Sequence, residues 1–325
     1  MNTLKTSHQR RVTVLVPCYN EAEVLPVLYD ALCRVATEEA AYAWDFLFVN
    51  DGSRDDTLVV LRRLRQEDAR VSYVDLSRNF GKERAMLAGF DYAGGDAVIV
   101  MDADMQHPPS LIPQMLRAWE VGYEDVYARR TNRDGDGWLR RRLTHGYYKL
   151  LARATRGEVL ENVGDFRLLD RRCIEALRQM RETERYTKGM FSWIGFRKKE
   201  IPFEVQQRAA GKSSWSYAEL MRLAIEGITS YTTAPLRLAT WTGLLCALGA
   251  FLYMCFFFVK TLVVGDDVQG FPTLIIVILF LGGVQLVSLG IIGEYLGRIF
   301  HETKRRPPYL VREVEGAREE NTVAN

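Results

Sequence analysis

The first hundred residues alternate short apolar runs with segments whose apolar positions recur at helical intervals. Four apolar runs predict strands, at Val12–Tyr19, Trp44–Asp51, Val71–Ser77 and Ala97–Asp104, and the first of them is rich in β-branched residues. Three segments between them predict helices, at Glu21–Thr37, Leu58–Gln66 and Lys82–Tyr92. Strands separated by single helices imply right-handed crossovers, so we expect an α/β domain with a parallel sheet covered on both faces.

Two later segments, Leu238–Val259 and Val268–Gly293, carry no charge and are long enough to cross a bilayer as helices. Neither has an amphipathic face, which argues against the alternative of two buried core helices. The link Lys260–Gly270 carries little positive charge, whereas the outer ends are basic at Arg222, Arg237, Arg298, Lys304, Arg305 and Arg306. By the positive-inside rule, the hairpin loop faces outward and both termini face the cytoplasm.

These patterns predict six regions. They are a cytoplasmic α/β domain over 1–212, an interfacial juxtamembrane helix over 213–236, transmembrane helices over 237–264 and 271–297, an external loop over 265–270 and a cytoplasmic tail over 298–325. The N-terminus lacks the apolar stretch of a signal peptide, so we expect a multi-pass protein of the inner membrane. Basic and aromatic residues over Trp138–Arg156 and Trp215–Tyr231 are typical of helices on an anionic membrane surface. The polar residues from Val314 onward are expected to be frayed.

Composition excludes several other classes of protein. The 325 residues include 43 Lys and Arg against 41 Asp and Glu, and this net charge of +2 makes no case for nucleic acid. A hydrophobic share of 48% excludes a disordered chain. The five cysteines lack CxxC spacing, which favours a reducing compartment over a disulfide framework or a cysteine metal site.

Polar and acidic residues follow the predicted strands at the edge where parallel sheets bind ligands. The carboxylates of Asp102 and Asp104, followed by Gln106, are hard oxygen ligands that suit Mg²⁺ or Mn²⁺ on a diphosphate. Aspartate pairs also occur as turn and cap residues, but Asp51 ends another strand of the same sheet, so we favour the metal interpretation. His107 and His145 lack a partner His or Cys at ligand spacing, and we interpret both as surface residues.

Several motifs carry a resemblance to known enzymes. V-P-C-Y-N-E (16–21), N-D-G-S (50–53) and D-A-D-M-Q (102–106) resemble the nucleotide-sugar-binding half of the family 2 glycosyltransferases of GT-A fold. R-N-F-G-K (78–82), E-N-V-G-D-F-R-L (161–168), E-G-I-T-S (226–230), A-P-L-R (234–237) and G-E-Y-L-G-R (293–298) resemble polyisoprenyl-phosphate glycosyltransferases. The similarity is greatest to bactoprenol glucosyltransferases. It is lower to undecaprenyl-phosphate aminoarabinose transferases and dolichyl-phosphate mannose synthases. The resemblance implies a Rossmann-like GT-A catalytic domain with a C-terminal two-helix transmembrane hairpin.

The activity that this resemblance implies is inverting transfer of a hexose, with glucose from UDP-glucose favoured, to undecaprenyl phosphate at the cytoplasmic membrane face. The product would be a lipid-linked sugar donor for cell-surface glycan modification. A UDP-sugar, undecaprenyl phosphate and the lipid bilayer are the implied partners, and a homotetramer is the implied assembly. Transfer of mannose, aminoarabinose or N-acetylglucosamine is an alternative, as is a non-catalytic membrane scaffold. A processive polysaccharide synthase is disfavoured, because the chain has no Gln-x-x-Arg-Trp motif and two helices cannot enclose a pore.

The resemblance also implies roles for individual residues. Those that bind the nucleotide sugar would be Pro17, Tyr19, Glu21, Asp51, Lys82 and Asp102, and those that hold Mg²⁺ or Mn²⁺ would be Asp102, Asp104 and Gln106. Contacts to the diphosphate and the acceptor phosphate would come from Arg130, Arg140, Arg208, Lys212 and Ser213. The lysine of the Arg-x-x-Gly-x-Ser-Lys motif of mannose synthases is displaced here, to Lys212.

The catalytic residues implied are Asp104 and Asp165. An acceptor phosphate is already anionic at pH 7 and needs no strong general base. Catalysis then requires neutralising the diphosphate, aligning the acceptor and stabilising an electron-poor anomeric carbon. The alternative for Asp165 is a capped turn paired with Arg167.

Overall fold

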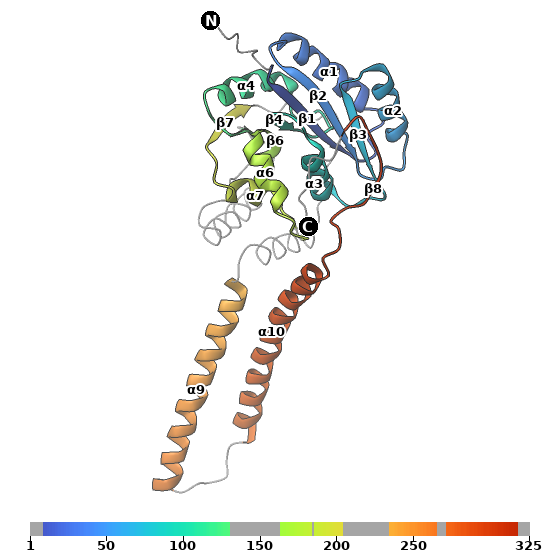
Figure 1. Cartoon of the computed structure of the whole chain (residues 1–325). Helices are drawn as coiled ribbons and strands as arrows, with labels where there is room; N and C mark the ends of the chain where they lie inside the picture. The colour runs from blue at the N-terminus through green and yellow to red at the C-terminus, as the bar shows by residue number, and fades with distance from the viewer. Residues whose placement is uncertain (1–8, 131–162, 184, 204–233, 265–270, 318–325) are drawn as a thin grey trace, which may run out of the picture. The chain divides into compact units, whose positions relative to one another are not determined.

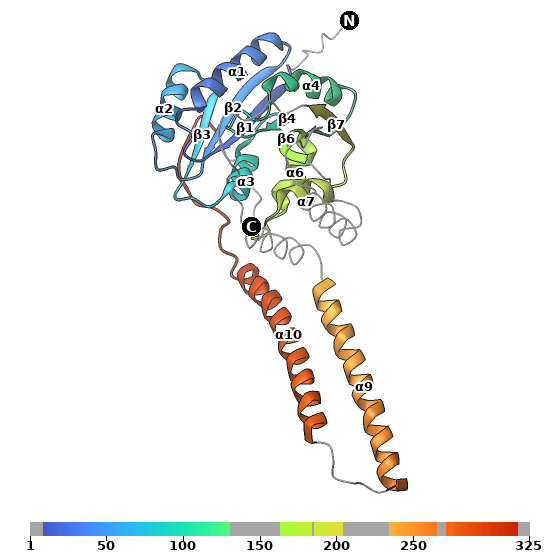
Figure 2. The same cartoon turned by 180° about the vertical axis from the view of Figure 1, so that it is seen from behind.

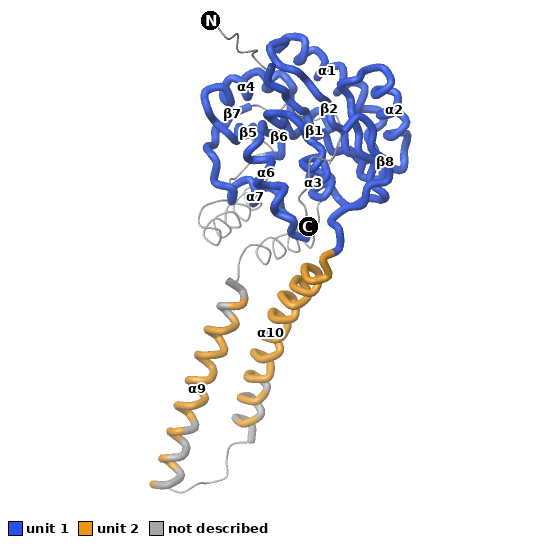
Figure 3. Tube along the Cα trace, in the orientation of Figure 1, with its two compact units in different colours: residues 1–148, 158–213, 306–325 blue, residues 149–157, 214–305 orange. Residues whose placement is uncertain are grey.

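The structure is a computed structural model of the chain, and it describes residues 9–130, 163–183, 185–203, 234–264 and 271–317. The chain divides into two compact units (Figure 3). The sheet unit comprises residues 1–148, 158–213 and 306–325, and the hairpin unit comprises residues 149–157 and 214–305. Each unit is described by itself below.

The four predicted strands form the centre of the sheet. β1 (Arg11–Cys18) pairs in parallel with β2 (Ala43–Asn50) and with β4 (Ala97–Val100), and β2 pairs in parallel with β3 (Val71–Leu76). The connecting helices are α1 (Leu25–Glu38), α2 (Thr57–Glu67) and α3 (Lys82–Tyr92). The predicted parallel core with single-helix crossovers is therefore confirmed.

The sheet extends beyond these parallel strands and is mixed among the described residues. Its eight strands follow the order β7-β5-β6-β4-β1-β2-β3-β8. β6 (Val163–Asp170) runs antiparallel to both β4 and β5 (Asp125–Arg130), and β5 pairs in parallel with β7 (Lys198–Phe203). The direction of β6 relative to β4 depends on pairing across 67 or more positions of sequence, as between Val100 and Arg167, which local apolar patterns do not encode.

The last strand corrects the expectation of a frayed end for Val314–Ala317, and residues 318–325 of that tail lie outside the described residues. β8 (Val311–Glu315) pairs antiparallel with β3 at the edge of the sheet. The Tyr73 hydroxyl donates to carboxylates of Glu313 and Glu315, over 2.5 and 3.0 Å. These contacts order a polar segment whose composition alone predicts no element.

Helices cover both faces of the sheet (Figures 1 and 2). α1, α2 and α4 (Ile112–Glu120), with the 3-10 turn η1 (Pro109–Leu111), pack on the face to which β1 contributes Val12, Val14 and Val16. α3, α6 (Arg171–Gln179) and α7 (Thr187–Trp193) pack on the opposite face with Leu15. Burial of both sets of side chains explains why β1 reads as a continuous apolar run.

The hairpin unit contains two long helices, α9 (Ala234–Val264) and α10 (Phe271–Thr303), which contact each other. Among the described residues, one helical segment, Phe280–Thr303, is long and apolar enough to cross a membrane. Ala239–Tyr253 in α9 is a shorter apolar stretch. Large apolar side chains of both helices are exposed, including Leu245 and Leu286.

Candidate active site

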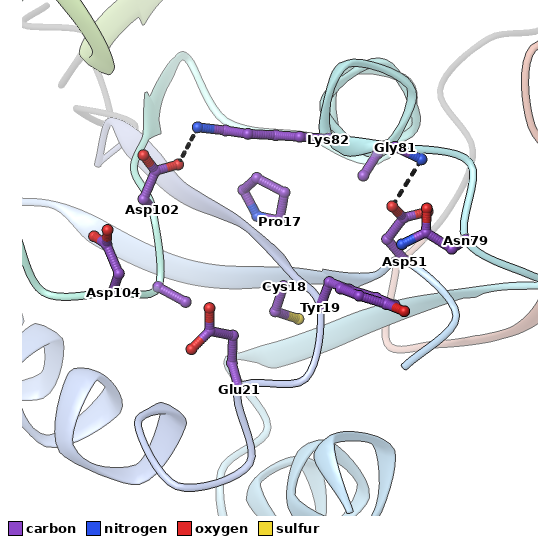
Figure 4. A pocket seen from close by; sticks show the side chains of 12 residues that line it. Pro17, Cys18, Tyr19, Glu21, Asp51, Asn79, Gly81, Lys82, Asp102 and Asp104 are labelled. Carbon is purple, nitrogen blue, oxygen red and sulfur yellow. Dashed lines mark hydrogen bonds and ion pairs between the residues drawn. The ribbon is translucent and has the colours of Figure 1, made fainter. Parts of the chain in front are cut away.

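A cavity of about 340 Å³ opens at the carboxyl ends of β1, β2 and β4, beside the first turn of α3 (Figure 4). The lining residues are Pro17, Cys18, Tyr19, Glu21, Asp51, Asn79, Gly81, Lys82, Ala85, Asp102, Ala103 and Asp104. β1 lies here between its two parallel neighbours, at the switch point where such sheets bind ligands. The structure thus brings together all six residues predicted to bind a nucleotide sugar.

Hydrogen bonds join the loops that follow β1 and β2. The backbone N–H of Asn20 donates to the Ser53 hydroxyl over 2.9 Å, and the N–H of Arg54 donates to the Asn20 side chain over 2.8 Å. Asn20 takes a φ of 57°, in the left-handed region that asparagine tolerates better than most residues. This pairing holds Tyr19 and Glu21 beside Asp51. The motifs at 16–21 and 50–53 therefore line the same side of the cavity.

Asp51 anchors the loop that leads into α3. Its carboxylate accepts the backbone N–H groups of Phe80 and Gly81 over 2.7 and 2.9 Å (Figure 4). Burial raises the pKa of Asp51, although these two bonds oppose the shift. Each carboxylate oxygen keeps a further lone pair that can accept from a ligand.

Lys82 joins two carboxylates from different strands. Its Nζ lies 2.5 Å from an oxygen of Asp102, after β4, and 2.5 Å from an oxygen of Asp165, in β6. Burial alone would lower the pKa of Lys82, but the charges of Asp165 and Asp102 outweigh it and raise that pKa. Burial would raise the pKa of Asp165, but Lys82 and then Lys188 outweigh it and lower that pKa. Lys82 and Asp165 are therefore both charged at neutral pH.

Asp102 and Asp104 form a cluster with His107 in which one ligand atom from each residue lies within 4.8 Å of the others. Figure 4 shows both carboxylates on one side of the cavity, with Asp51 on the other. Burial raises the pKa of the nearby Glu21, and the charges of Asp104, Asp55 and Asp102 raise it further. A divalent cation would offset this concentration of negative charge, so the donor set fits Mg²⁺ or Mn²⁺.

Gln106 and Arg130 lie next to this acidic cluster. The backbone N–H of Gln106 donates to Asp104 over 3.1 Å, and its side-chain oxygen accepts from Arg130 over 3.1 Å. This contact holds the Arg130 guanidinium, at the end of β5, beside the acidic cluster, where it could bind a diphosphate.

The interpretation of His107 as a surface residue is wrong. Its side chain is only 3% exposed and packs between the rings of Phe166 and Phe203, at centroid distances of 5.4 and 5.6 Å. Burial lowers its pKa, which keeps the imidazole neutral at pH 7. The apolar residues Pro108 and Pro109, which follow it directly, are the sequence signal that could have indicated a buried position.

Four predicted phosphate-binding residues, Arg140, Arg208, Lys212 and Ser213, lie outside the described residues, as do His145 and the two predicted surface helices. The structure adds Asn79, Gly81 and Ala85 to the lining of the cavity. Asn79 and Gly81 belong to the quoted R-N-F-G-K motif, so a signal for them was present in the sequence. Cys18 also lines the cavity, and burial raises the pKa of its thiol, which makes it a poor nucleophile.

The mixed sheet and the acidic cavity at the carboxyl ends of its parallel strands agree with the GT-A fold that the motifs predict. Residues 13–178 match the model of glycosyl transferase family 2, and residues 234–299 match the GtrB C-terminal hairpin. The chain belongs to glycosyl transferase family 2 and carries the hairpin of the GtrB type.

Relatives match nearly the whole chain. A bactoprenol glucosyl transferase of Shigella phage SfV is 41% identical over 93% of this chain and 98% of its own length. A prophage bactoprenol glucosyl transferase homolog of Escherichia coli K12 is 39% identical, over 94% of this chain and 99% of its own. Among solved structures, glucosyl-3-phosphoglycerate synthase of Mycobacterium tuberculosis with Mn²⁺, UDP and phosphoglyceric acid is 19% identical, with a TM-score of 0.47 over 67% of this chain and 75% of that one.

Proposed function

We propose that this enzyme transfers glucose from UDP-glucose to undecaprenyl phosphate, with inversion at the anomeric carbon, at the cytoplasmic face of the inner membrane. The observation that carries the proposal is 41% identity to a bactoprenol glucosyl transferase over 93% of the chain. The cavity supports it independently, because its acidic end suits a metal diphosphate. The product would donate the sugar to a cell-surface glycan.

In this proposal the base and ribose occupy the end of the cavity formed by Pro17, Tyr19, Glu21 and Asp51. The Tyr19 side chain is 40% exposed at the cavity, and an exposed aromatic ring can stack on a uracil base. The Asp51 carboxylate, fixed by two backbone N–H groups, can accept a hydrogen bond from the base or ribose. Both groups therefore present an ordered surface to the nucleotide.

The proposed ligands of Mg²⁺ or Mn²⁺ are Asp102, Asp104 and Gln106. When bound, such an ion neutralises charge on the leaving diphosphate. Arg130 and Lys82 lie beside these carboxylates and add positive charge at the same end of the cavity. In this proposal the diphosphate of the donor lies at the end of the cavity that contains the metal ion, Arg130 and Lys82.

Asp165 is the proposed catalytic carboxylate on the acceptor side, together with Asp104 at the metal. Its Oδ1 is buried and has no hydrogen-bond partner among the described residues, while its Oδ2 pairs with Lys82. A buried anion at this place stabilises positive charge that develops on the anomeric carbon. Arg140, Arg208, Lys212 and Ser213 complete the proposed set that aligns the acceptor phosphate.

We also propose that both hairpin helices span the membrane, with residues 265–270 outside and both termini in the cytoplasm. The uncharged stretches of α9 and α10 and the basic residues at their outer ends support this arrangement. The domain limits predicted from the sequence, and a homotetramer, belong to the same proposal.

The test is an assay of membranes that contain the protein, supplied with undecaprenyl phosphate and a panel of radiolabelled UDP- and GDP-sugars. We expect metal-dependent, lipid-extractable label from UDP-glucose, and its loss in membranes carrying D104N. Label from a different sugar would keep the transferase and replace glucose by one of the alternatives. No lipid-extractable label from any sugar would favour the non-catalytic scaffold.

A further inference from the structure

The imidazole of His107 is buried without a hydrogen-bond partner at the edge of the acidic cavity. The residue is 3% exposed, and neither Nδ1 nor Nε2 has a partner within the described part of the chain. A buried polar group left unpaired costs about 1–3 kcal/mol. Native proteins keep such a group where a water, an ion or a ligand satisfies it.

The surroundings of the ring show where that partner must lie. Phe166 and Phe203 pack against the ring and offer no hydrogen-bonding side-chain group. A Cβ at Gly164 would lie only 2.9 Å from Nε2, so the glycine leaves the room that the ring occupies. Of the polar groups nearby, the carboxylates of Asp102 and Asp104 come within 4.8 Å of an imidazole nitrogen.

We propose that His107 is a direct ligand of the divalent ion held by Asp102 and Asp104. This assignment rests on the proposed metal site and adds a nitrogen donor to its oxygen ligands. The packing of the ring fixes its orientation in advance, which reduces the entropy lost when the ion binds. The side-chain oxygen of Gln106 is meanwhile engaged by Arg130, so the histidine supplies a donor independent of that contact.

A nitrogen ligand has a consequence for the choice of metal. Imidazole is a softer donor than carboxylate, and Mg²⁺ strongly prefers an all-oxygen shell. We therefore expect Mn²⁺ to bind more tightly than Mg²⁺, and His107→Gln to weaken Mn²⁺ binding at least about 10-fold while affecting Mg²⁺ less.

Pulsed electron paramagnetic resonance of bound Mn²⁺ tests the proposal without reference to turnover. The full chain, purified through a histidine-free tag and held in nanodiscs, would be loaded with Mn²⁺ with and without UDP. We expect nitrogen modulation from a coordinated imidazole, and a change in its frequency when the protein is grown with ¹⁵N-histidine. That isotope experiment uses the unaltered protein, so it does not depend on whether a variant folds.

Variants then assign the signal among the four histidines of the chain. His107→Gln should abolish the modulation, whereas His301→Gln, in the exposed end of α10, should leave it unchanged. Mn²⁺ binding that depends on Asp102 and Asp104 but shows no nitrogen modulation would overturn the role of His107 and leave the metal site intact. Mn²⁺ binding that is unaffected by D102N and D104N would overturn the metal site and the histidine assignment together.

Discussion

At the scale of single residues, Lys82 supplies the positive charge between two carboxylates of the site. Its ammonium group lies 2.5 Å from Asp102, after β4, and 2.5 Å from Asp165, in β6, and its charge lowers the pKa of Asp165. A phosphate group entering the cavity would compete with these carboxylates for the same ammonium group.

Asp165→Asn is expected to fold and insert normally and to lose activity. The amide keeps the size of the carboxylate but removes the negative charge proposed to stabilise the anomeric centre, so we expect kcat to fall on the order of 100-fold. The measurement is the rate of lipid-linked glucose formation, with UDP affinity as the control for an intact donor site. Wild-type rates in this variant would remove Asp165 from the mechanism and leave the capped-turn interpretation.

The ion pair of Lys82 and Asp165 should contribute the same stability to the protein at every pH near neutrality. The pKa of Asp165 lies below its ordinary 3.8, so its contribution is complete above that value and is lost as the pH falls further. The pKa of Lys82 lies above its ordinary 10.5, so its contribution is complete below that value and is lost as the pH rises further. The difference in Tm between wild type and Asp165→Asn should be constant from about pH 5 to about pH 10 and shrink on both sides. A difference that changes between about pH 6 and pH 8 would contradict this pairing.

Gly52→Ala is expected to disrupt the wall of the cavity. Gly52 has a φ of +64°, and a Cβ there would lie 2.3 Å from the backbone carbon of Arg78, so the loop that Asp51 anchors would have to move. We expect at least about 10-fold weaker UDP binding, together with a lower Tm, because left-handed strain and a backbone clash act together. Gly243→Ala is the matched control, since a Cβ there meets nothing within 4 Å. Unchanged UDP binding in Gly52→Ala would show that the loop tolerates the shift.

At the scale of elements, β8 couples the C-terminal segment to the sheet edge near the cavity. Arg312 lies 3.3 Å from the buried carboxylate of Asp75 in β3, and Asp75 accepts from the side chain of Asn50 over 2.8 Å. Asn50 in turn accepts from Ser53. A continuous set of contacts therefore links β8 to the loop that follows β2.

Arg312→Ala tests this coupling. Without the arginine, the buried carboxylate of Asp75 loses its ion-pair partner and keeps only the weaker influence of Arg62, and we expect about 1–2 kcal/mol loss of unfolding free energy, moderated by the exposure of Arg312. The measurement is chemical denaturation of the chain in detergent, and the double variant Arg312→Ala, Asp75→Asn is the control. Because the double variant has no unpaired charge, it should recover part of the loss. If the losses of unfolding free energy in the two single variants simply add in the double variant, the two residues are not coupled.

At the scale of the whole molecule, the chain combines a charged sheet unit with a hairpin unit whose large side chains are exposed and apolar. Exposed apolar surface of that extent is stable only against lipid or protein. The proposed acceptor is itself a membrane lipid. In the proposed function, the hairpin would keep the nucleotide-sugar site at the membrane that contains the lipid acceptor.

The proposed topology can be tested with single cysteines in a variant lacking the five native ones. Asp267→Cys, in the link between the helices, should react with an impermeant maleimide added to intact spheroplasts. Lys304→Cys, just beyond α10, should react only after permeabilisation, because positive flanks stay in the cytoplasm. Labelling of Lys304→Cys from outside would reverse the orientation.

Much of the site follows from residues close together in sequence. Asp102 and Asp104 end an apolar run, and Asp51 ends another, so the parallel topology alone places them at one edge of the sheet. Asp165 and His107 behave differently. The motif at 161–168 indicates Asp165, but its place beside Lys82 depends on the antiparallel pairing of β6 with β4, and His107 is buried by Phe166 and Phe203 from distant strands.

The sequence by itself determined the βαβ rhythm, the acidic residues at the strand ends and the two uncharged helices, because each depends on local periodicity or on adjacent residues. Only the tertiary structure decided the antiparallel insertion of β6, the return of β8 to the sheet edge and the burial of His107 beside the carboxylates. Those three depend on pairing and packing between segments far apart in the chain. The energy of such contacts cannot be predicted from the sequence pattern of any one segment.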